Sequence, residues 1–330
     1  MILERLALVN FRNYGHLDVE FSPQRNLLVG RNDQGKSNPL ESIYFLSYLR
    51  SRRAARRTDL VGEGTDKASV PGLIMGDGPE AKVKVTFGRG GRVAEVNRRK
   101  VDSGARTKGI LKSASFEPDD LYPVKGEPGR RREFLDETLG ALGPVDADNV
   151  SKYRHVLKQR NGILKSWEEY GAGLTDAIEP WNQALVSAGA KIIASRVEML
   201  KAMAEREISE RRRKALDSAF GGEKTERSTK VGPHRDDVEI SIGGRESRFM
   251  GSQGEQRTLA FCVRLAQKEN IERATGRTPV MLPDEERKGR VLEAAGRSSQ
   301  AIITATDIPA DTRRASDKTF VVEKGMASIG

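Results

Sequence analysis

The stretch Gly30-Arg31-Asn32-Asp33-Gln34-Gly35-Lys36-Ser37 decides the fold prediction, because it matches the phosphate-binding loop pattern G-x-x-x-x-G-K-[ST]. The apolar run 27–29 before it predicts a strand covered on both faces, and apolar residues at helical spacing follow it over 39–49. In such a loop, backbone N–H groups and the start of the helix surround the phosphates. Lys36 is therefore the candidate phosphate ligand, and the hydroxyl of Ser37 is the candidate magnesium ligand.

The composition is typical of a folded, highly charged protein; the excess of positive charge favours a polyanionic partner but only weakly separates nucleic-acid binding from plain solubility. The chain has 330 residues, with 57 Lys and Arg against 47 Asp and Glu, a net charge of +10 and 37% apolar residues. No apolar run approaches the roughly 20 residues that a membrane span needs, so we expect no membrane association and a cytoplasmic location. One cysteine excludes an internal disulfide, and three scattered histidines cannot build a Cys/His zinc site.

The rest of the chain divides into a strand-rich part and a helical part. Alternating apolar residues predict one hairpin across 6–21 and another across 83–96. From about Phe116 the spacing is helical, and residues 181–205 predict one long helix. Strands and helices resume after residue 225. We therefore predict an α/β fold in which residues 1–115 and 226–330 form one lobe, and residues 116–225 form an inserted helical lobe.

A second motif, Phe249–Arg257, places a serine and a glycine at the start of an amphipathic helix. A hydroxyl and free amides at the positive end of a helix can receive a phosphate, although the same residues also fit an ordinary capping box. In combination with the phosphate-binding loop and the interposed helical lobe, this motif resembles the signature motif of ABC-type ATPases. In that class the motif reaches across a dimer to the nucleotide held by the other subunit.

Seven segments occur in the order found in the bacterial RecF family, so the chain resembles that family over nearly its whole length. The resemblance implies an ABC-type P-loop ATPase head with a mixed sheet, an antiparallel β subdomain and an inserted helical lobe. It also implies ATP and Mg²⁺ as cofactors. The segments are Asn10–Tyr14, Gly35–Asn38, Glu117–Leu121, Arg131–Asp136, Val156–Asn161, Val231–Asp237 and Ser252–Leu259.

The function implied by the resemblance is that of a recombination mediator. ATP would join two copies head to tail on DNA, and slow hydrolysis would release them. The implied partners are RecR, with RecO and RecA, because the family cooperates with RecR and RecO in loading RecA at single-strand gaps. Two other readings are a transporter-type ABC ATPase subunit and a P-loop kinase. The N-terminal Asn10-Phe11-Arg12 motif argues against the first, and the kinase reading leaves Ser252–Gln256 unexplained.

The resemblance assigns roles to individual residues. In the loop, Lys36 and Ser37 match the phosphate and magnesium positions. Arg12 matches an arginine that touches the nucleotide phosphates in related heads. Ser252 and Gly254 match the residues offered to the γ-phosphate of the other subunit. Further nucleotide-contacting positions are matched by Gly30, Asn32, Gly35 and Asn38, and the switch segment by Thr304, Thr306 and Asp307.

One departure from the family concerns hydrolysis. In the family, the strand after the signature helix ends in two acidic residues, the Walker B pair, but here Val280–Leu282 runs into Pro283-Asp284-Glu285-Glu286. We interpret the pair as missing and Asp284 as the match of a later aspartate in the dimer loop, so no catalytic residue is assigned. The helical lobe is also short near residues 205–227. Either the chain is a degenerate relative or the sequence omits residues at both places; binding is better supported than hydrolysis.

Basic residues cluster in two places, after the phosphate-binding loop and in the helical lobe. Each cluster can serve as a solvated face or as a contact surface for DNA phosphates. Few aromatic residues interleave with them, so the sequence predicts neither a stacking platform nor sequence-specific readout. The candidate DNA-binding residues are Arg52, Arg53, Arg56 and Arg57, and the second cluster is Arg211–Lys214.

Overall fold

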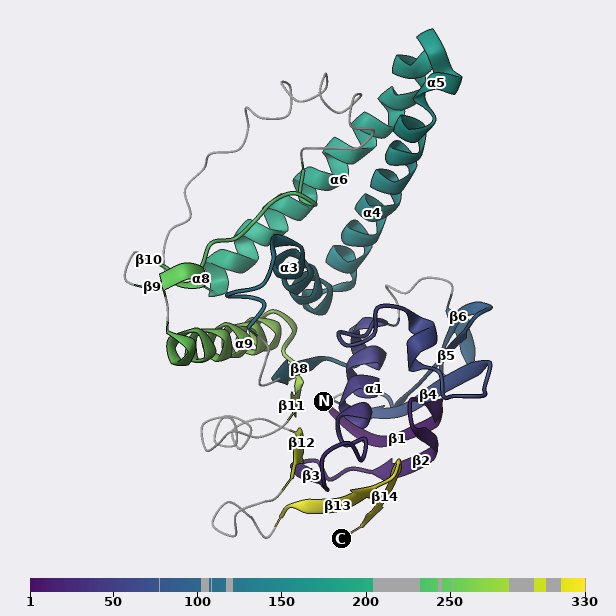
Figure 1. The fold of residues 1–330 in the computed structure, drawn as a ribbon, viewed down its shortest axis with the longest axis vertical. Coiled ribbons are helices and arrows are strands. Elements are labelled where there is room, and N and C mark those ends of the chain that lie inside the picture. Colours follow the sequence, from purple (N-terminus) through teal and green to yellow (C-terminus); the bar gives the residue numbers. More distant parts are fainter. Residues whose placement is uncertain are drawn as a thin grey trace. The chain divides into compact units, whose positions relative to one another are not determined.

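The computed structural model describes residues 1–76, 78–101, 107, 109–116, 121–203, 232–242, 245–250, 252–284, 300–306 and 316–329. Three features singled out in the sequence lie outside these residues: the acidic segment Glu117–Asp120, the basic cluster Arg211–Lys214 and Asp307. The chain forms two compact units (Figure 1). The first comprises residues 1–120 and 264–330, and the second comprises residues 121–263.

An antiparallel sheet in the first unit has the strand order β2-β1-β4-β5-β6-β7. The two predicted hairpins are confirmed, because β1 pairs with β2 and β5 pairs with β6 in antiparallel register. Buried and exposed residues alternate along β5, where Val83, Val85 and Phe87 point into the core. The strands are β1 (Ile2–Phe11), β2 (Tyr14–Glu20), β4 (Lys67–Met75), β5 (Ala81–Gly88), β6 (Gly91–Val96) and β7 (Arg99–Val101).

The second sheet of this unit has the order β14-β13-β3-β12-β11-β8 and is parallel except for β14 at its edge. All described residues of β8, β11 and β12 are buried, as expected for strands covered on both faces. The carboxyl ends of parallel strands share one edge, which is where ligands bind in such sheets. The strands are β3 (Arg25–Val29), β8 (Ser113–Phe116), β11 (Val280–Pro283), β12 (Ala301–Ala305), β13 (Lys318–Glu323) and β14 (Met326–Ile329).

Helix α1 (Ser37–Tyr48) lies between the two sheets (Figure 1). It contacts β1, β4 and β5 of the antiparallel sheet and β8 of the parallel sheet. Every residue from Pro39 to Tyr48 is buried, although this helix carries polar side chains as well as apolar ones. A helix enclosed in this way is fixed in place, and the loop that precedes it is therefore held at a defined position.

The second unit is built on a long antiparallel pair of helices, α4 and α6 (Figure 1). Its core contains Phe134, Leu139, Tyr153, Ile192 and Met199, contributed by three helices. These helices are α3 (Pro128–Leu142), α4 (Pro144–Lys165) and α6 (Leu174–Met203). The smaller elements of the second unit are α5 (Trp167–Tyr170), η2 (Gly171–Gly173), β9 (Ser241–Ile242), β10 (Arg245–Glu246) and α8 (Ser247–Met250). The first unit has one such element, η1 (Arg57–Leu60), among its described residues.

The segment 232–263 belongs to this helical unit, whereas the sequence placed everything after residue 225 in the other lobe. Val238 and Val263 pack against the apolar cluster of the helices. Arg131 donates to both carboxylate oxygens of Asp237, and this hydrogen bond lowers the pKa of Asp237 below its usual value. Packing and an ion pair therefore attach the segment to the helices.

The long helix predicted over residues 181–205 is present, but it starts earlier than predicted. Helix α6 begins at Leu174 rather than at residue 181, and Pro180 lies inside it. Buried Leu174 and Ile178 extend the apolar face of the helix ahead of the proline, so packing overrides the local breaker. Helix α9 (Gln253–Thr275) spans the division between the units. None of the described helices is both long and apolar enough to cross a membrane.

Candidate nucleotide-binding site

The phosphate-binding loop connects the carboxyl end of β3 to the start of α1, as the sequence predicts. The ammonium group of Lys36 is folded into the loop, where its Nζ donates to the carbonyl oxygens of Gly30 and Arg31 at 2.7 and 2.9 Å. The side-chain oxygen of Asn32 lies 3.5 Å from the same nitrogen. The side chain of the N-cap residue, Lys36, makes no capping hydrogen bond to α1. The loop thus places a positive charge beside the N-terminus of a helix, which is an anion-binding arrangement.

Two glycines of the loop are required by its geometry. A Cβ atom at Gly30 would lie 2.3 Å from the carbonyl oxygen of Val322 on the neighbouring strand. Gly35 has a φ of +97°, and a Cβ there would lie 2.5 Å from the side chain of Asn13. Asp33 has a φ of +63°, a conformation that aspartate tolerates better than most residues.

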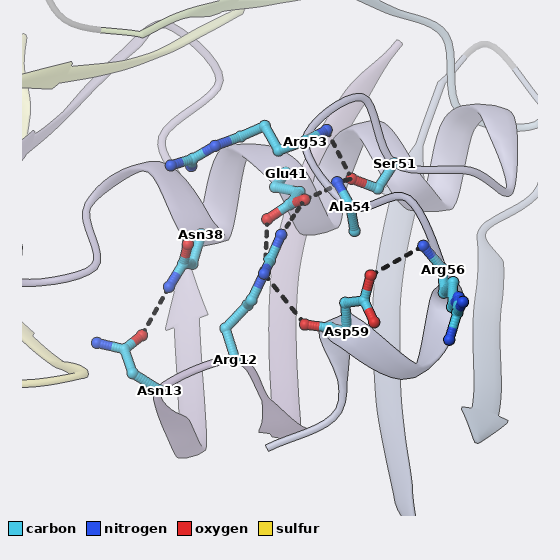
Figure 2. Close-up of polar contacts among 9 residues, drawn as sticks. All are labelled: Arg12, Asn13, Asn38, Glu41, Ser51, Arg53, Ala54, Arg56 and Asp59. Atoms are coloured by element: carbon cyan, nitrogen blue, oxygen red, sulfur yellow. Dashed lines mark hydrogen bonds and ion pairs between the residues drawn. The ribbon is translucent and has the colours of Figure 1, made fainter. Parts of the chain in front are cut away.

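The turn between β1 and β2 is hydrogen-bonded to the loop. Asn13 donates from its Nδ2 to the carbonyl oxygen of Gln34 at 3.2 Å, and it accepts from Nδ2 of Asn38 at 2.7 Å (Figure 2). The hydroxyl of Tyr14 donates to the carbonyl oxygen of Gly35 at 3.1 Å. Asn38 and the Arg12-Asn13 turn are therefore brought together at the loop. Asn13 was not assigned from the sequence, and its place beside Arg12 in the turn is the signal that points to it.

The position of Asp284 corrects the sequence-based interpretation. Instead of belonging to a dimer loop, Asp284 directly follows β11, and its Oδ1 accepts from the hydroxyl of Ser37 at 2.8 Å and from that of Thr304 at 2.6 Å. The adjacent parallel strands β11 and β12 end at the same edge, and this register brings the two side chains to the loop. Thr304 is buried, Thr306 is exposed, and Glu285 lies outside the described residues.

These residues fit a magnesium ion that is shared with a phosphate. A hydroxyl and a carboxylate are hard oxygen ligands, and Mg²⁺ is usually held by one or two carboxylates together with substrate phosphates. Within the described part of the chain, no group of three or more His, Cys, Asp or Glu side chains could hold a metal by itself. A small pocket opens beside Ser37 and Asp284; it is also lined by Leu40, Glu41, Tyr44, Arg52, Arg53 and Ser115.

Arg12 forms a bidentate ion pair with Glu41 of α1. Its Nε and Nη2 donate to the two carboxylate oxygens at 3.0 and 2.9 Å, and its Nη1 donates to the carbonyl oxygen of Asp59 at 3.0 Å (Figure 2). The side chain of Glu41 is only 3% exposed. Sequence reasoning missed Glu41. An acidic residue between Leu40 and Ile43 on an apolar helix, four residues after Ser37, is the signal that could have found it.

The predicted DNA-binding arginines lie on the segment that follows α1. Arg53, Arg56 and Arg57 are exposed, whereas the guanidinium of Arg52 lies 4.4 Å from the ring centroid of Tyr44. Arg92 on β6 lies close to this segment, because its Nη1 donates to the carbonyl oxygen of Leu49 at 3.1 Å. Partial burial and the nearby charge of Arg57 lower the pKa of its guanidinium from the usual value. The surface suits a polyanion that is bound through its phosphates.

The signature motif opens α9 in the second unit. The carbonyl oxygen of Ser252 accepts from the backbone N–H of Gln256, and buried Gln256 donates from its side chain to the carbonyl oxygen of Ser247 at 3.0 Å. Ser252 and Gly254 are both exposed. A Cβ atom added at Gly254 would meet nothing within 4 Å, so packing within the chain does not require this glycine.

Comparisons with known proteins find similarity over nearly the whole chain. A model of the family described as RecF/RecN/SMC N terminal domain matches residues 2–307. The DNA replication and repair protein RecF of Streptococcus pneumoniae strain P1031 is 29% identical over 366 aligned positions, covering 100% of this chain and 99% of the relative. Because the chain has 330 residues, that relative contains segments that are absent here.

Solved structures give the same match. A structure of the recombination mediator protein RecF with ATP in the RecFOR pathway superposes with a TM-score of 0.88 at 30% identity, covering 99% of this chain and 97% of that one. An SMC head bound to the C-terminal winged-helix domain of ScpA superposes with a TM-score of 0.52 at 18% identity, which is a likeness of fold. The expected fold class, an α/β ATPase head of the ABC type, is thereby confirmed.

Proposed function

Because the chain belongs to the RecF/RecN/SMC N-terminal domain family, we propose that it is an ATP-dependent DNA-binding recombination mediator of DNA replication and repair. The observation that carries the proposal is the arrangement around Ser37. A complete phosphate-binding loop, an acidic strand end and a segment rich in arginine all belong to one unit, and one pocket connects them.

ATP would be held by residues of the first unit. The loop amides and Lys36 would bind the phosphates, Ser37 and Asp284 would hold Mg²⁺, and Arg12 would approach the phosphates from the β1–β2 turn. Bound Mg²⁺ neutralises charge on the phosphate oxygens. Lys36 now donates to two carbonyl oxygens of its own loop, so a phosphate would take over donors that already point into the loop. We propose binding, rather than rapid turnover, as the main role of ATP.

Two copies would share the nucleotide. Ser252 and Gly254 of one copy would cover the phosphates held by the other, giving a head-to-tail dimer. The exposure of both residues and the open space at Gly254 support an intermolecular contact. On DNA, the dimer would act with RecR and RecO to load RecA at single-strand gaps. This part of the proposal rests on the similarity to RecF of the RecFOR pathway.

Duplex DNA binding tests this function. With ATP and Mg²⁺, we expect the affinity to rise, and the logarithm of the binding constant to fall linearly with the logarithm of the salt concentration, because basic residues displace condensed counterions. Fluorescence anisotropy with labelled DNA of two unrelated sequences measures both effects. The two sequences should give nearly equal affinities. A flat salt response, or no effect of ATP, would contradict the proposal.

Replacing Asp284 with Asn tests the magnesium position. The change keeps the shape of the side chain but removes its charge, so Mg²⁺ should strengthen ATP binding about tenfold less than in the unaltered chain, a difference of about 1.4 kcal/mol. Titration of a fluorescent ATP analogue in the presence of Mg²⁺ or of EDTA measures the ratio of ATP dissociation constants without and with Mg²⁺. The control is Asp18→Asn, which removes a carboxylate charge from the exposed pair with Arg5 in the same unit and should leave the effect of Mg²⁺ unchanged. Equal ratios in D284N and the unaltered chain would rule out the assignment.

A further inference from the structure

The segment Ser51–Asp59, called here the basic loop, is attached at both ends to the Arg12–Glu41 ion pair (Figure 2). At its start, the hydroxyl of Ser51 donates to Oε1 of Glu41. Near its end, the carbonyl oxygen of Asp59 accepts from Nη1 of Arg12. The two carboxylate oxygens of Glu41 thus receive three donors from two separate segments of the chain. A buried carboxylate that is hydrogen-bonded in this way fixes its partners in place.

The same contacts shape the interior of the loop. Oγ of Ser51 accepts from the backbone N–H groups of Arg53 and Ala54 at 3.0 and 2.9 Å, while it donates to Glu41. The carboxylate of Asp59 accepts from the backbone N–H of Arg56 at 2.9 Å. Hydrogen bonds therefore lead from the backbone of two candidate DNA-binding arginines to Glu41 and Arg12. These contacts hold the backbone that carries the exposed arginine side chains.

Glu41 also lies next to the nucleotide site. It is four residues after Ser37 on the same face of α1, and both line the pocket that Arg52 and Arg53 line as well. A guanidinium has five N–H donors. Among the described residues, the side chain of Arg12 uses three of them for Glu41 and Asp59. A phosphate can thus contact Arg12 while the ion pair stays in place.

We propose that Glu41 is a positioning residue that couples ATP binding to DNA binding. Through Arg12 and Ser51 it holds the basic loop against α1, so that ATP contacting Arg12 and the pocket orders the arginines that contact DNA. The inference rests on the proposed function and adds the route by which the two ligands affect one another. Because such coupling is reciprocal, DNA also strengthens ATP binding by the same factor.

The test measures the ratio of DNA dissociation constants without and with ATP and Mg²⁺ in the full chain. Glu41→Gln and Ser51→Ala should each lower this ratio about fivefold or more, toward one, because the loop is no longer held to Arg12. Ser51→Thr, which keeps the hydroxyl, should retain the ratio of the unaltered chain. The matched control for E41Q is Asp18→Asn, which neutralises the exposed ion pair with Arg5 in the same unit and should leave the ratio unchanged.

Hydrogen exchange of a peptide covering the basic loop provides a second measurement. ATP should slow exchange in the unaltered chain and in S51T, and it should have little effect in E41Q and S51A. A purely structural role would change the melting temperature but leave the ratio of dissociation constants as it is, and that result overturns the inference. If the unaltered chain binds ATP and DNA, but E41Q gives the same ratio of dissociation constants as the unaltered chain, only the inference fails. If the unaltered chain binds no ATP, the proposed function fails, and the inference fails with it.

Discussion

Lys36→Met is expected to abolish ATP binding at concentrations that saturate the unaltered chain, a loss of about 100-fold or more in affinity, or roughly 3 kcal/mol. Lys36 is 4% exposed, and its ammonium group is the charge that the loop encloses. Methionine occupies a similar volume but cannot neutralise a triphosphate. Because ATP is proposed to join two copies, ATP-dependent dimerisation should disappear as well. A fluorescent ATP analogue measures the first effect, and light scattering measures the second.

The control for this variant is Lys82→Met, which removes an exposed lysine of the same unit and should leave ATP binding intact. Methionine also removes the donor that now serves two loop carbonyl oxygens, so the melting temperature of each variant must be recorded by circular dichroism. If K36M remains folded and still dimerises with ATP, the assignment of the phosphate-binding loop is wrong.

The loop itself could be predicted because its requirements are local. Glycines at positions 30 and 35 are imposed by backbone conformation and by close neighbours, and a strand and a helix directly flank them. The two hairpins were predictable for the same reason, since alternation along a strand reports which face is buried. Such features are encoded within a short stretch of the chain.

Long-range pairings could not be predicted in this way. Glu41 meets Arg12 across 29 positions, and Asp284 meets Ser37 across 247 positions. The second contact depends on the strand order β3-β12-β11 in the parallel sheet, which places strands from distant parts of the chain side by side. Judged by its neighbours in sequence, Asp284 resembled a residue of a later loop. Its place at the end of a buried strand decides its surroundings instead.

The assignment of residues 232–263 shows a different limit. Short apolar stretches predicted strands there, but the described strands β9 and β10 contain two residues each. What holds the segment is a set of contacts with α3, α4 and α6, including Arg132 donating to the carbonyl oxygen of Asp236 and Arg196 donating to that of Pro233. These arginines lie far from their partners in sequence, so no local pattern indicates the attachment.

Ser252→Arg is expected to prevent ATP-dependent dimerisation while each single copy still binds ATP. Ser252 is exposed at the start of α9, so arginine fits without displacing packed atoms. Placing a positive charge at a helix N-terminus costs roughly 0.3–1 kcal/mol, too little to unfold a domain of ordinary stability. In the proposed dimer, however, the larger side chain would occupy the space that a phosphate of the other copy needs. Sedimentation with saturating ATP analogue should therefore give a monomer.

Ser151→Arg is the matched control for S252R. It introduces the same side chain at an exposed serine on α4 of the same unit, away from the signature motif in sequence, and should leave dimerisation and ATP affinity unchanged. The decisive comparison is between ATP affinity and assembly in S252R. Dimers that persist with ATP would show that Ser252 does not face the other copy. Loss of ATP binding in a folded S252R monomer would show that Ser252 serves the nucleotide of its own chain, because a residue acting only on the other copy leaves the binding of a single copy intact.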